Sequence, residues 1–174
     1  TDPDADRVGI AMKCPDGTYE LVSGNEVGVL LLDYIAAGRI ESGTMPKNPV
    51  AVKSIVSTPL ADAVAANYGV ELRSVLTGFK WIGDQIAQLE ADGEVERFIF
   101  GFEESYGYLL GTYARDKDAV EGSMMILEMT AYYKKLNMTL SDALEALYEK
   151  YGVYGEKVID IYMEGLDGIE KRRR

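Results

Sequence analysis

One stretch, residues 98–118, places the strongest limits on what this chain can fold into. Its sequence is FIFGFEESYGYLLGTYARDKD, and its first three residues are an apolar run that predicts a buried strand. Two acids and a serine follow, at Glu103, Glu104 and Ser105. Open α/β sheets bind their ligands in loops at the carboxyl ends of the strands. The stretch therefore predicts a central strand followed by a binding loop.

A second polar segment comes shortly after the first, at residues 115–118, RDKD. The first segment offers hydrogen-bond acceptors, which the hydroxyls of a sugar require. The second offers cations, Arg115 and Lys117, which a phosphate requires. Taken alone, these residues also fit an alternative, a solvated turn followed by the charged start of a helix.

Strand and helix patterns alternate along the rest of the chain. Strands are expected at 8–12, 19–22, 50–56, 70–76 and 157–163, and helices at 23–38, 58–68, after 78, at 118–136 and at 139–152. In the helix at 118–136 we expect Met124, Leu127 and Ala131 to face the core. This order predicts an α/β fold with a mixed, largely parallel sheet and flanking helices, together with part of a preceding α/β domain.

Residues 41–49, ESGTMPKNP, carry two prolines and a glycine and predict a linker. We therefore expect residues 1–41 to be the C-terminal part of one domain, 42–49 to be a linker and 50–174 to be a second domain. The first piece has too small a core to fold well alone, which indicates a fragment of a longer protein.

Composition excludes several classes of function. The net charge of −11 argues against a nucleic acid as partner. No apolar run approaches the length of a membrane span. The single cysteine, Cys14, cannot form an internal disulfide, which favours a reducing, cytoplasmic location. The chain has no histidine, so nucleophile pairs that need histidine and histidine metal sites are excluded, and any metal must be held by oxygen.

Three aspartates, Asp2, Asp4 and Asp6, alternate in a segment that is not helical in pattern. In an extended loop, alternate side chains share a side, and three adjacent carboxylates repel one another unless a cation neutralises them. A small set of oxygen ligands suits Mg²⁺. An EF-hand loop is excluded because Arg7 and Lys13 replace its glycine and its glutamate. An acidic surface turn is the alternative.

Four segments together carry a resemblance to a known family. They are DPDADR at 2–7, TGFKWIG at 77–83, GFEESYGY at 101–108 and RDKD at 115–118. In order and spacing they resemble the α-D-phosphohexomutases, the phosphoglucomutase and phosphomannomutase superfamily. The resemblance covers essentially the whole chain, as the end of the family's second domain followed by its third.

The resemblance implies an isomerase of carbohydrate metabolism. In that family a phosphoserine donates its phosphoryl group to a hexose monophosphate, and the bisphosphate intermediate, such as glucose 1,6-bisphosphate, reorients before the serine recovers the other phosphate. The resemblance implies that Asp2, Asp4 and Asp6 hold Mg²⁺, with the arginine Arg7 beside them. In-line phosphoryl transfer chiefly needs charge neutralisation and positioning, which agrees with these residue types.

The resemblance also implies a substrate site. Glu103 and Ser105 correspond to the residues that hold the sugar's 3- and 4-hydroxyls. Lys117 corresponds to a lysine that contacts phosphate and transfers a proton, and we expect the metal and other nearby cations to lower its pKa. Gly78, Lys80 and Arg115 complete the expected substrate-binding set, although Lys80 and Arg115 could instead pair with neighbouring acids.

Other parts of the family's enzyme have no counterpart here. The serine-histidine nucleophile loop is absent, and RIESGTMP at 39–46 resembles the phosphate-binding motif of the final domain only with altered spacing and with Met45 in place of a glutamate. We therefore expect a central fragment that lacks domains 1 and 4 and is inactive alone. Phosphoglucomutase is the preferred activity; phosphomannomutase, phosphopentomutase and a non-catalytic sugar-phosphate-binding module are the alternatives.

Overall fold

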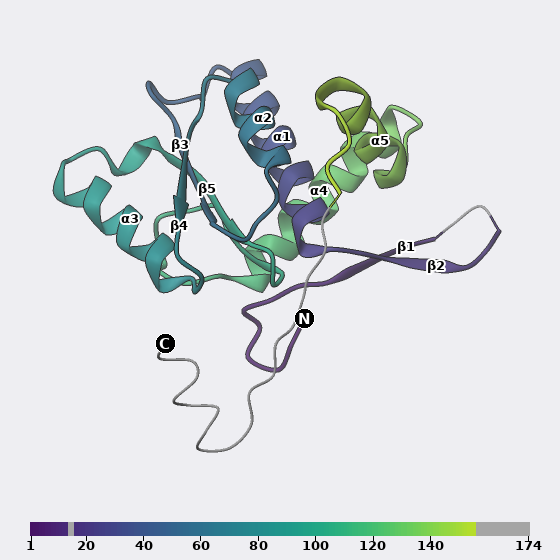
Figure 1. Cartoon of the computed structure of the whole chain (residues 1–174), viewed down its shortest axis with the longest axis horizontal. Coiled ribbons are helices and arrows are strands. Elements are labelled where there is room, and N and C mark those ends of the chain that lie inside the picture. Colours follow the sequence, from purple (N-terminus) through teal and green to yellow (C-terminus); the bar gives the residue numbers. More distant parts are fainter. Residues whose placement is uncertain (14–15, 156–174) are drawn as a thin grey trace.

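The computed structural model describes residues 1–13 and 16–155 (Figure 1). Its strands are β1 (Ile10–Lys13), β2 (Tyr19–Val22), β3 (Val50–Ser54), β4 (Glu71–Val75), β5 (Phe98–Glu103) and β6 (Gly107–Leu109). Its helices are α1 (Gly24–Glu41), α2 (Leu60–Asn67), α3 (Lys80–Ala91), α4 (Ala119–Lys135) and α5 (Leu140–Tyr151), with a short 3-10 helix, η1 (Val95–Arg97). The strand expected at 157–163 lies outside the described residues.

The main sheet has four strands in the order β4-β3-β5-β6. β3 pairs in parallel with both β4 and β5, and β6 returns antiparallel to β5. Every residue of β3 and β5 is buried, as expected for strands covered by helices on both faces. The predicted α/β fold with a mixed, largely parallel sheet is confirmed.

Helices cover both faces of the sheet (Figure 1). On one face α3 packs against β3 and β5 around a small core that contains Val50, Val52 and Ile86. On the other face α1, α2, α4 and α5 share a larger core that contains Ala51 and Phe100. Because side chains alternate along a strand, Val50 and Val52 face one core while Ala51 faces the other.

The helix α1 begins where the sequence predicts, with Ser23 as its N-cap. Ser23 accepts a hydrogen bond from the backbone N–H of Glu26, and the Glu26 carboxylate accepts one from the N–H of Ser23. The expected end at Gly38 is wrong, since the helix continues to Glu41. The N–H and the hydroxyl of Ser42 both donate to the carbonyl oxygen of Gly38, at 2.9 and 2.7 Å, so Ser42 caps the helix instead.

Packing ties α1 to the sheet. It contacts β5, α2, α4 and α5, and a Cβ atom added to Gly28 would lie 2.3 Å from the ring of Phe102. The segment 42–49 therefore does not coincide with a break in the core. The hairpin of β1 and β2 is different, because it extends away from the body of the molecule as a separate two-stranded sheet (Figure 1).

The face of α4 that meets the core differs from the expected one. Met124 and Leu127 are 68% and 70% exposed, and Ala131 is exposed as well. The buried side is formed by Ala119, Gly122, Ile126, Met129 and Tyr133. Both stripes have helical spacing, so periodicity alone does not separate them. The small residue Gly122 lets the helix approach Val8 and Tyr108, which selects the second stripe.

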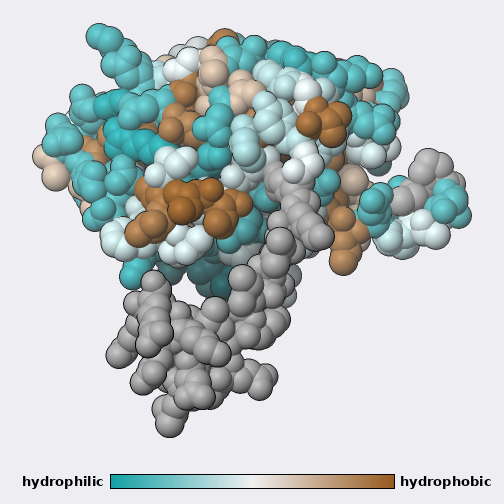
Figure 2. All heavy atoms as spheres, in the orientation of Figure 1, coloured by the Kyte–Doolittle hydropathy of each residue, from teal (hydrophilic) through white to brown (hydrophobic). Residues whose placement is uncertain are grey.

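Two further features concern the surface of the molecule and the apolar character of its helices. Figure 2 shows that the viewed face is largely hydrophilic, with apolar side chains in separate patches. Within residues 1–13 and 16–155, no helix combines the length and the apolarity that crossing a membrane would require.

Candidate functional site

The candidate site residues gather at the carboxyl edge of the parallel strands. β5 ends at Glu103, a turn of three residues follows, and β6 begins at Gly107, which pairs with Glu103. β3 and β4 run parallel to β5, so the loops after them meet this same edge. The edge also exposes three apolar side chains, Ile55, Val56 and Leu76.

The acidic loop at the start of the chain is fastened to this edge by backbone contacts. Arg7 forms an antiparallel bridge with Gly107, and the N–H of Val8 donates to the carbonyl oxygen of Tyr106 at 3.2 Å. At the first turn of α4, the N–H of Ala119 donates to the carbonyl oxygen of Ala5 at 3.0 Å. These contacts bring residues 2–7 against β6 and against the N-terminus of α4.

Within this loop the three aspartates converge. One carboxylate oxygen from each of Asp2, Asp4 and Asp6 can be chosen so that the three atoms lie within 4.8 Å of one another. The Asp2 carboxylate accepts hydrogen bonds from the backbone N–H groups of Arg7, at 3.1 Å, and Asp6, at 3.2 Å. The bond from Arg7 is the largest cause of a lowered pKa at Asp2, which keeps this carboxyl ionised.

The arrangement fits a hard divalent cation. Asp6 Oδ1 is buried and has no hydrogen-bond partner among the described residues, and Arg7 Nε is 3.8 Å away, beyond hydrogen-bonding distance. Asp4 is exposed to solvent. Three carboxylates with one unsatisfied oxygen, open on one side to water, form a donor set that suits Mg²⁺.

Lys117 joins the acidic loop to the loop before α4. Its Nζ lies 2.7 Å from Asp6 Oδ2 and 3.4 Å from Asp116 Oδ1, and its side chain is only 11% exposed. Burial alone would lower the pKa of Lys117, but the hydrogen bond to Asp6 and the charge of Asp116 outweigh burial and raise it. The expected lowering depends on a metal and other cations nearby, whereas the neighbours of the ammonium group among the described residues are carboxylates.

Glu103 lies beside Lys117. It is buried, and a Cβ atom added to Gly107 would lie 2.9 Å from Glu103 Oε1 and 2.6 Å from Lys117 Cδ. Only a glycine allows both side chains to pass this close to the first residue of β6. Ser105 is half-buried in the turn between the two strands. The structure thus brings Glu103, Lys117 and Asp6 together around Gly107.

The other expected substrate residues gather near the N-terminus of α3. A Cβ atom added to Gly83, in the first turn of α3, would lie 2.4 Å from the carbonyl oxygen of Arg115, so α3 touches the loop before α4 there. The guanidinium of Arg115 reaches along α3 to Glu90, at 2.6 Å. Lys80 places its ammonium 5.1 Å from the centre of the Trp81 ring, and Gly78 has a φ of 105°. The charged groups of Arg115 and Lys80 therefore contact Glu90 and Trp81 rather than the cluster around Lys117.

Supporting contacts below the turn were not anticipated from the sequence. The hydroxyl of Ser54 donates to Glu104 Oε2 at 2.6 Å and lies 2.8 Å from the hydroxyl of Ser57. Lys53 is buried and donates to Asp62 Oδ2 at 2.7 Å and to the carbonyl oxygen of Thr58 at 3.0 Å. In the sequence, these contacts could have been suspected only from the lysine and the serine that end the apolar strand VAVKS. These bonds fix the loop after β3 and the Glu104 side chain.

A family model and individual relatives both match this chain. The family model of phosphoglucomutase/phosphomannomutase alpha/beta/alpha domain III matches residues 23–151. The phosphoglucomutase of Staphylococcus aureus strain RF122 is 40% identical over 171 residues, which is 98% of this chain and 30% of that protein. The chain thus spans about 30% of the length of the curated relatives it matches.

Solved structures share the fold. A structure from Thermus thermophilus, provisionally assigned as a phosphomannomutase, superposes with a TM-score of 0.67 at 26% identity, covering 88% of this chain and 30% of the other. The N-acetylphosphoglucosamine mutase of Aspergillus fumigatus, in complex with GlcNAc-6P and magnesium, gives a TM-score of 0.59 at 14% identity. That match covers 84% of this chain and 34% of the other, and at this identity it shows the fold alone.

Proposed function

Because this chain belongs to the phosphoglucomutase/phosphomannomutase family and carries its domain III, we propose that it forms the metal-binding and sugar-binding part of a Mg²⁺-dependent phosphohexomutase. The observation that carries the proposal is the meeting of the acidic loop, Lys117 and Glu103 around Gly107. The proposed reaction interconverts hexose 1-phosphate and hexose 6-phosphate through a phosphoserine and a bisphosphate intermediate.

In this proposal Asp2, Asp4 and Asp6 hold Mg²⁺, and Arg7 lies beside them. When bound there, the ion supplies positive charge next to the transferring phosphoryl oxygens. The convergence of the three carboxylates and the unsatisfied oxygen of Asp6 support this assignment.

Lys117 is proposed to bind a substrate phosphate and to carry the proton that leaves or joins the sugar oxygen. Its raised pKa supports a protonated ammonium before substrate arrives, which suits phosphate binding. Asp6 and Asp116 accept hydrogen bonds from two of the three donors of this ammonium group, so one donor remains for a phosphate.

Glu103 and Ser105 are proposed to hold two sugar hydroxyls. Glu103 is buried, so a bound sugar whose hydroxyl does not reach this carboxylate would leave it without a hydrogen-bond partner, at a desolvation cost. The site should therefore favour sugars whose hydroxyls have the matching stereochemistry. Gly78, Lys80 and Arg115 remain proposed substrate contacts. For Arg115 to reach a phosphate, its guanidinium would have to leave Glu90, an exposed and weakly held partner.

The complete enzyme is proposed to need further domains, including one that carries the phosphoserine. We propose that the chain alone has no mutase activity, because no residue in it corresponds to that nucleophile. We also propose that the boundary with the preceding domain lies near residue 23 rather than at 42–49, since α1 packs into the core of the sheet. A cytoplasmic location, favoured by the single cysteine, remains part of the proposal.

A chimera tests the proposed activity. The corresponding stretch of the S. aureus phosphoglucomutase would be replaced by this chain, and kcat/KM would be measured with glucose 1-phosphate and mannose 1-phosphate, each with Mg²⁺ and glucose 1,6-bisphosphate. We expect turnover with a preference for glucose 1-phosphate, as in the name of the more similar relatives. A preference for mannose 1-phosphate would favour the phosphomannomutase alternative. A folded chimera without turnover of either sugar would favour a non-catalytic binding module.

A further inference from the structure

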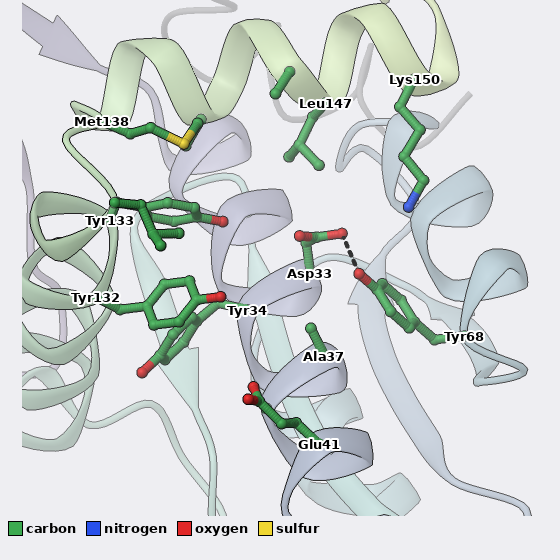
Figure 3. Close-up of a pocket in the computed structure, with 14 residues that line it drawn as sticks. Asp33, Tyr34, Ala37, Glu41, Tyr68, Tyr132, Tyr133, Met138, Leu147 and Lys150 are labelled. Atoms are coloured by element: carbon green, nitrogen blue, oxygen red, sulfur yellow. Dashed lines mark hydrogen bonds between the residues drawn. The ribbon is translucent and has the colours of Figure 1, made fainter.

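A second cavity lies away from the candidate site. It has a volume of about 400 Å³ and lies among the C-terminal half of α1, the end of α2, the C-terminal turns of α4, and α5 (Figure 3). Asp118, the N-cap of α4, directly follows Lys117 of the candidate site, whereas Tyr133, near the end of the same helix, lines this cavity. At 1.5 Å per helical residue these ends are about 22 Å apart, so the cavity is separate from the proposed active site.

Aromatic rings form much of its wall. Tyr34, Tyr68, Tyr132 and Tyr133 all line it, and Figure 3 shows them around a common space. The centre of the Tyr132 ring is 5.4 Å from that of Tyr34 and 5.4 Å from that of Tyr133, so these three rings form one continuous cluster. The faces of aromatic rings carry partial negative charge and attract cations.

A carboxylate stands at one side of the same space. Asp33 projects from α1 and accepts a hydrogen bond from the hydroxyl of Tyr68 at 2.9 Å (Figure 3). Within the described part of the chain, no lysine or arginine forms an ion pair with it. Burial raises the pKa of Asp33 above its usual value, and the Tyr68 bond and the charge of Lys150 only partly offset this. A half-buried carboxylate with no bonded cation would be stabilised by one.

The protein already places a cation on one of these rings. The ammonium of Lys150 lies 5.5 Å from the centre of the Tyr68 ring and 4.8 Å from that of Tyr151, at the edge of the cavity. The lining also includes Glu41, so its charged groups are two acids and one base. Both the rings and the net charge favour a positively charged occupant.

We propose that this cavity binds a small organic cation, carrying an alkylammonium or guanidinium group, between the tyrosine rings with Asp33 as its counter-ion. The volume lies within the range of small-molecule sites, and the polar groups are few and convergent. The proposal concerns a binding site that the mutase reaction does not use, so it does not depend on the proposed function.

Choline and its uncharged isostere 3,3-dimethyl-1-butanol test the proposal on the full 174-residue chain. Binding would be followed by NMR shifts of tyrosine ring protons. We expect choline to shift the resonances of Tyr68 and Tyr132 with a dissociation constant in the millimolar range, and the alcohol to bind at least about tenfold more weakly. Equal binding of the two compounds, or no tyrosine shift at 50 mM choline, would overturn the proposal.

Two variants make the test specific. Asp33→Asn keeps a hydrogen-bond acceptor for Tyr68 and removes the charge, and we expect it to weaken choline binding about tenfold. Glu145→Gln removes an exposed acid from α5 outside the cavity lining, and we expect no change. Tyr132→Leu removes one ring of the wall and is expected to weaken choline binding severalfold. Unchanged affinity in both Asp33→Asn and Tyr132→Leu, with the folded spectrum preserved, would also overturn the proposal.

Discussion

Lys117 Nζ lies 2.7 Å from Asp6 Oδ2, and this ion pair joins the acidic loop at the start of the chain to the loop before α4. In the sequence both segments are runs of charged residues that could each be solvated. Their contact, supported by the bridge between Arg7 and Gly107, makes one mixed site of acids and a base beside the turn between β5 and β6. Such a site can hold a cation and an anion together, as phosphoryl transfer requires.

The ion pair leads to a prediction about stability. Lys117→Met leaves Asp6 beside two other carboxylates without its ammonium partner, so we expect the free energy of unfolding to fall by about 1–2 kcal/mol without divalent ions. Urea unfolding of the 174-residue chain measures this. Lys47→Met, at an exposed lysine outside the site, is the control and should change little. Equal effects of the two substitutions would remove the ion pair from the account.

The proposed sugar contacts of Glu103 and Ser105 lead to a kinetic prediction. In the chimera with the S. aureus enzyme, Glu103→Gln and Ser105→Ala should each lower kcat/KM for glucose 1-phosphate. The expected loss of transition-state stabilisation is about 1–3 kcal/mol for each, since each substitution removes a hydrogen-bond partner of a sugar hydroxyl. Steady-state kinetics measures the change, and Glu145→Gln, on the exposed face of α5, serves as the matched control. Near wild-type values for both loop variants would show that the turn does not contact the sugar.

A pair of glycines in α1 tests how the turn is held. A Cβ atom at Gly24 would lie 2.1 Å from the carbonyl oxygen of Glu104, whereas one at Gly38 would meet nothing within 4 Å. Gly24→Ala should therefore displace the turn and cost about 1–3 kcal/mol, while Gly38→Ala should stabilise the helix by up to about 1 kcal/mol. Urea unfolding compares them. Similar effects of the two changes would mean that α1 does not press on the turn.

The raised pKa of Asp33 predicts a dependence of stability on pH. A carboxyl with a folded-state pKa above its unfolded value favours the protonated form in the fold. Its contribution is fully present below the unfolded pKa, about 3.9, and is lost as pH rises through the folded pKa. Ionised Asp33 therefore destabilises the fold at neutral pH, although Lys150 lessens the effect. Asp33→Asn should raise Tm at pH 7 and give a smaller gain at pH 3.5; a gain independent of pH would contradict this.

Much of the fold follows from local signals in the sequence. The helix patterns of α1 and α5, the apolar run of β5 and the polar residues after it predicted the elements and the edge that carries the candidate site. The three aspartates could be singled out because strict alternation of acids is unusual in a solvated turn. The resemblance in four segments then supplied roles that spacing alone does not give.

Other features depend on contacts that no local pattern encodes. Both faces of α4 have helical periodicity, and only its packing on Val8 and Tyr108 buries one of them. Glu104 follows Glu103 directly in the sequence, but only the structure shows that Ser54, from a different strand, donates a hydrogen bond to the Glu104 carboxylate. The cavity at Asp33 combines side chains from α1, α4 and α5 with Tyr68, which follows α2, so neither the rings nor the acid stood out in the sequence.

The claim that a cation held by Asp2, Asp4 and Asp6 lies beside Gly107 and Lys117 is tested most directly by paramagnetic relaxation. Mn²⁺, as a stand-in for Mg²⁺, would be titrated into the 174-residue chain while amide resonances are recorded by NMR. We predict selective broadening at Asp2–Arg7, Gly107 and Lys117, none at Asp33 or Tyr68, and loss of the effect in Asp4→Asn. Broadening confined to the N-terminal residues, or unaffected by Asp4→Asn, would contradict the account.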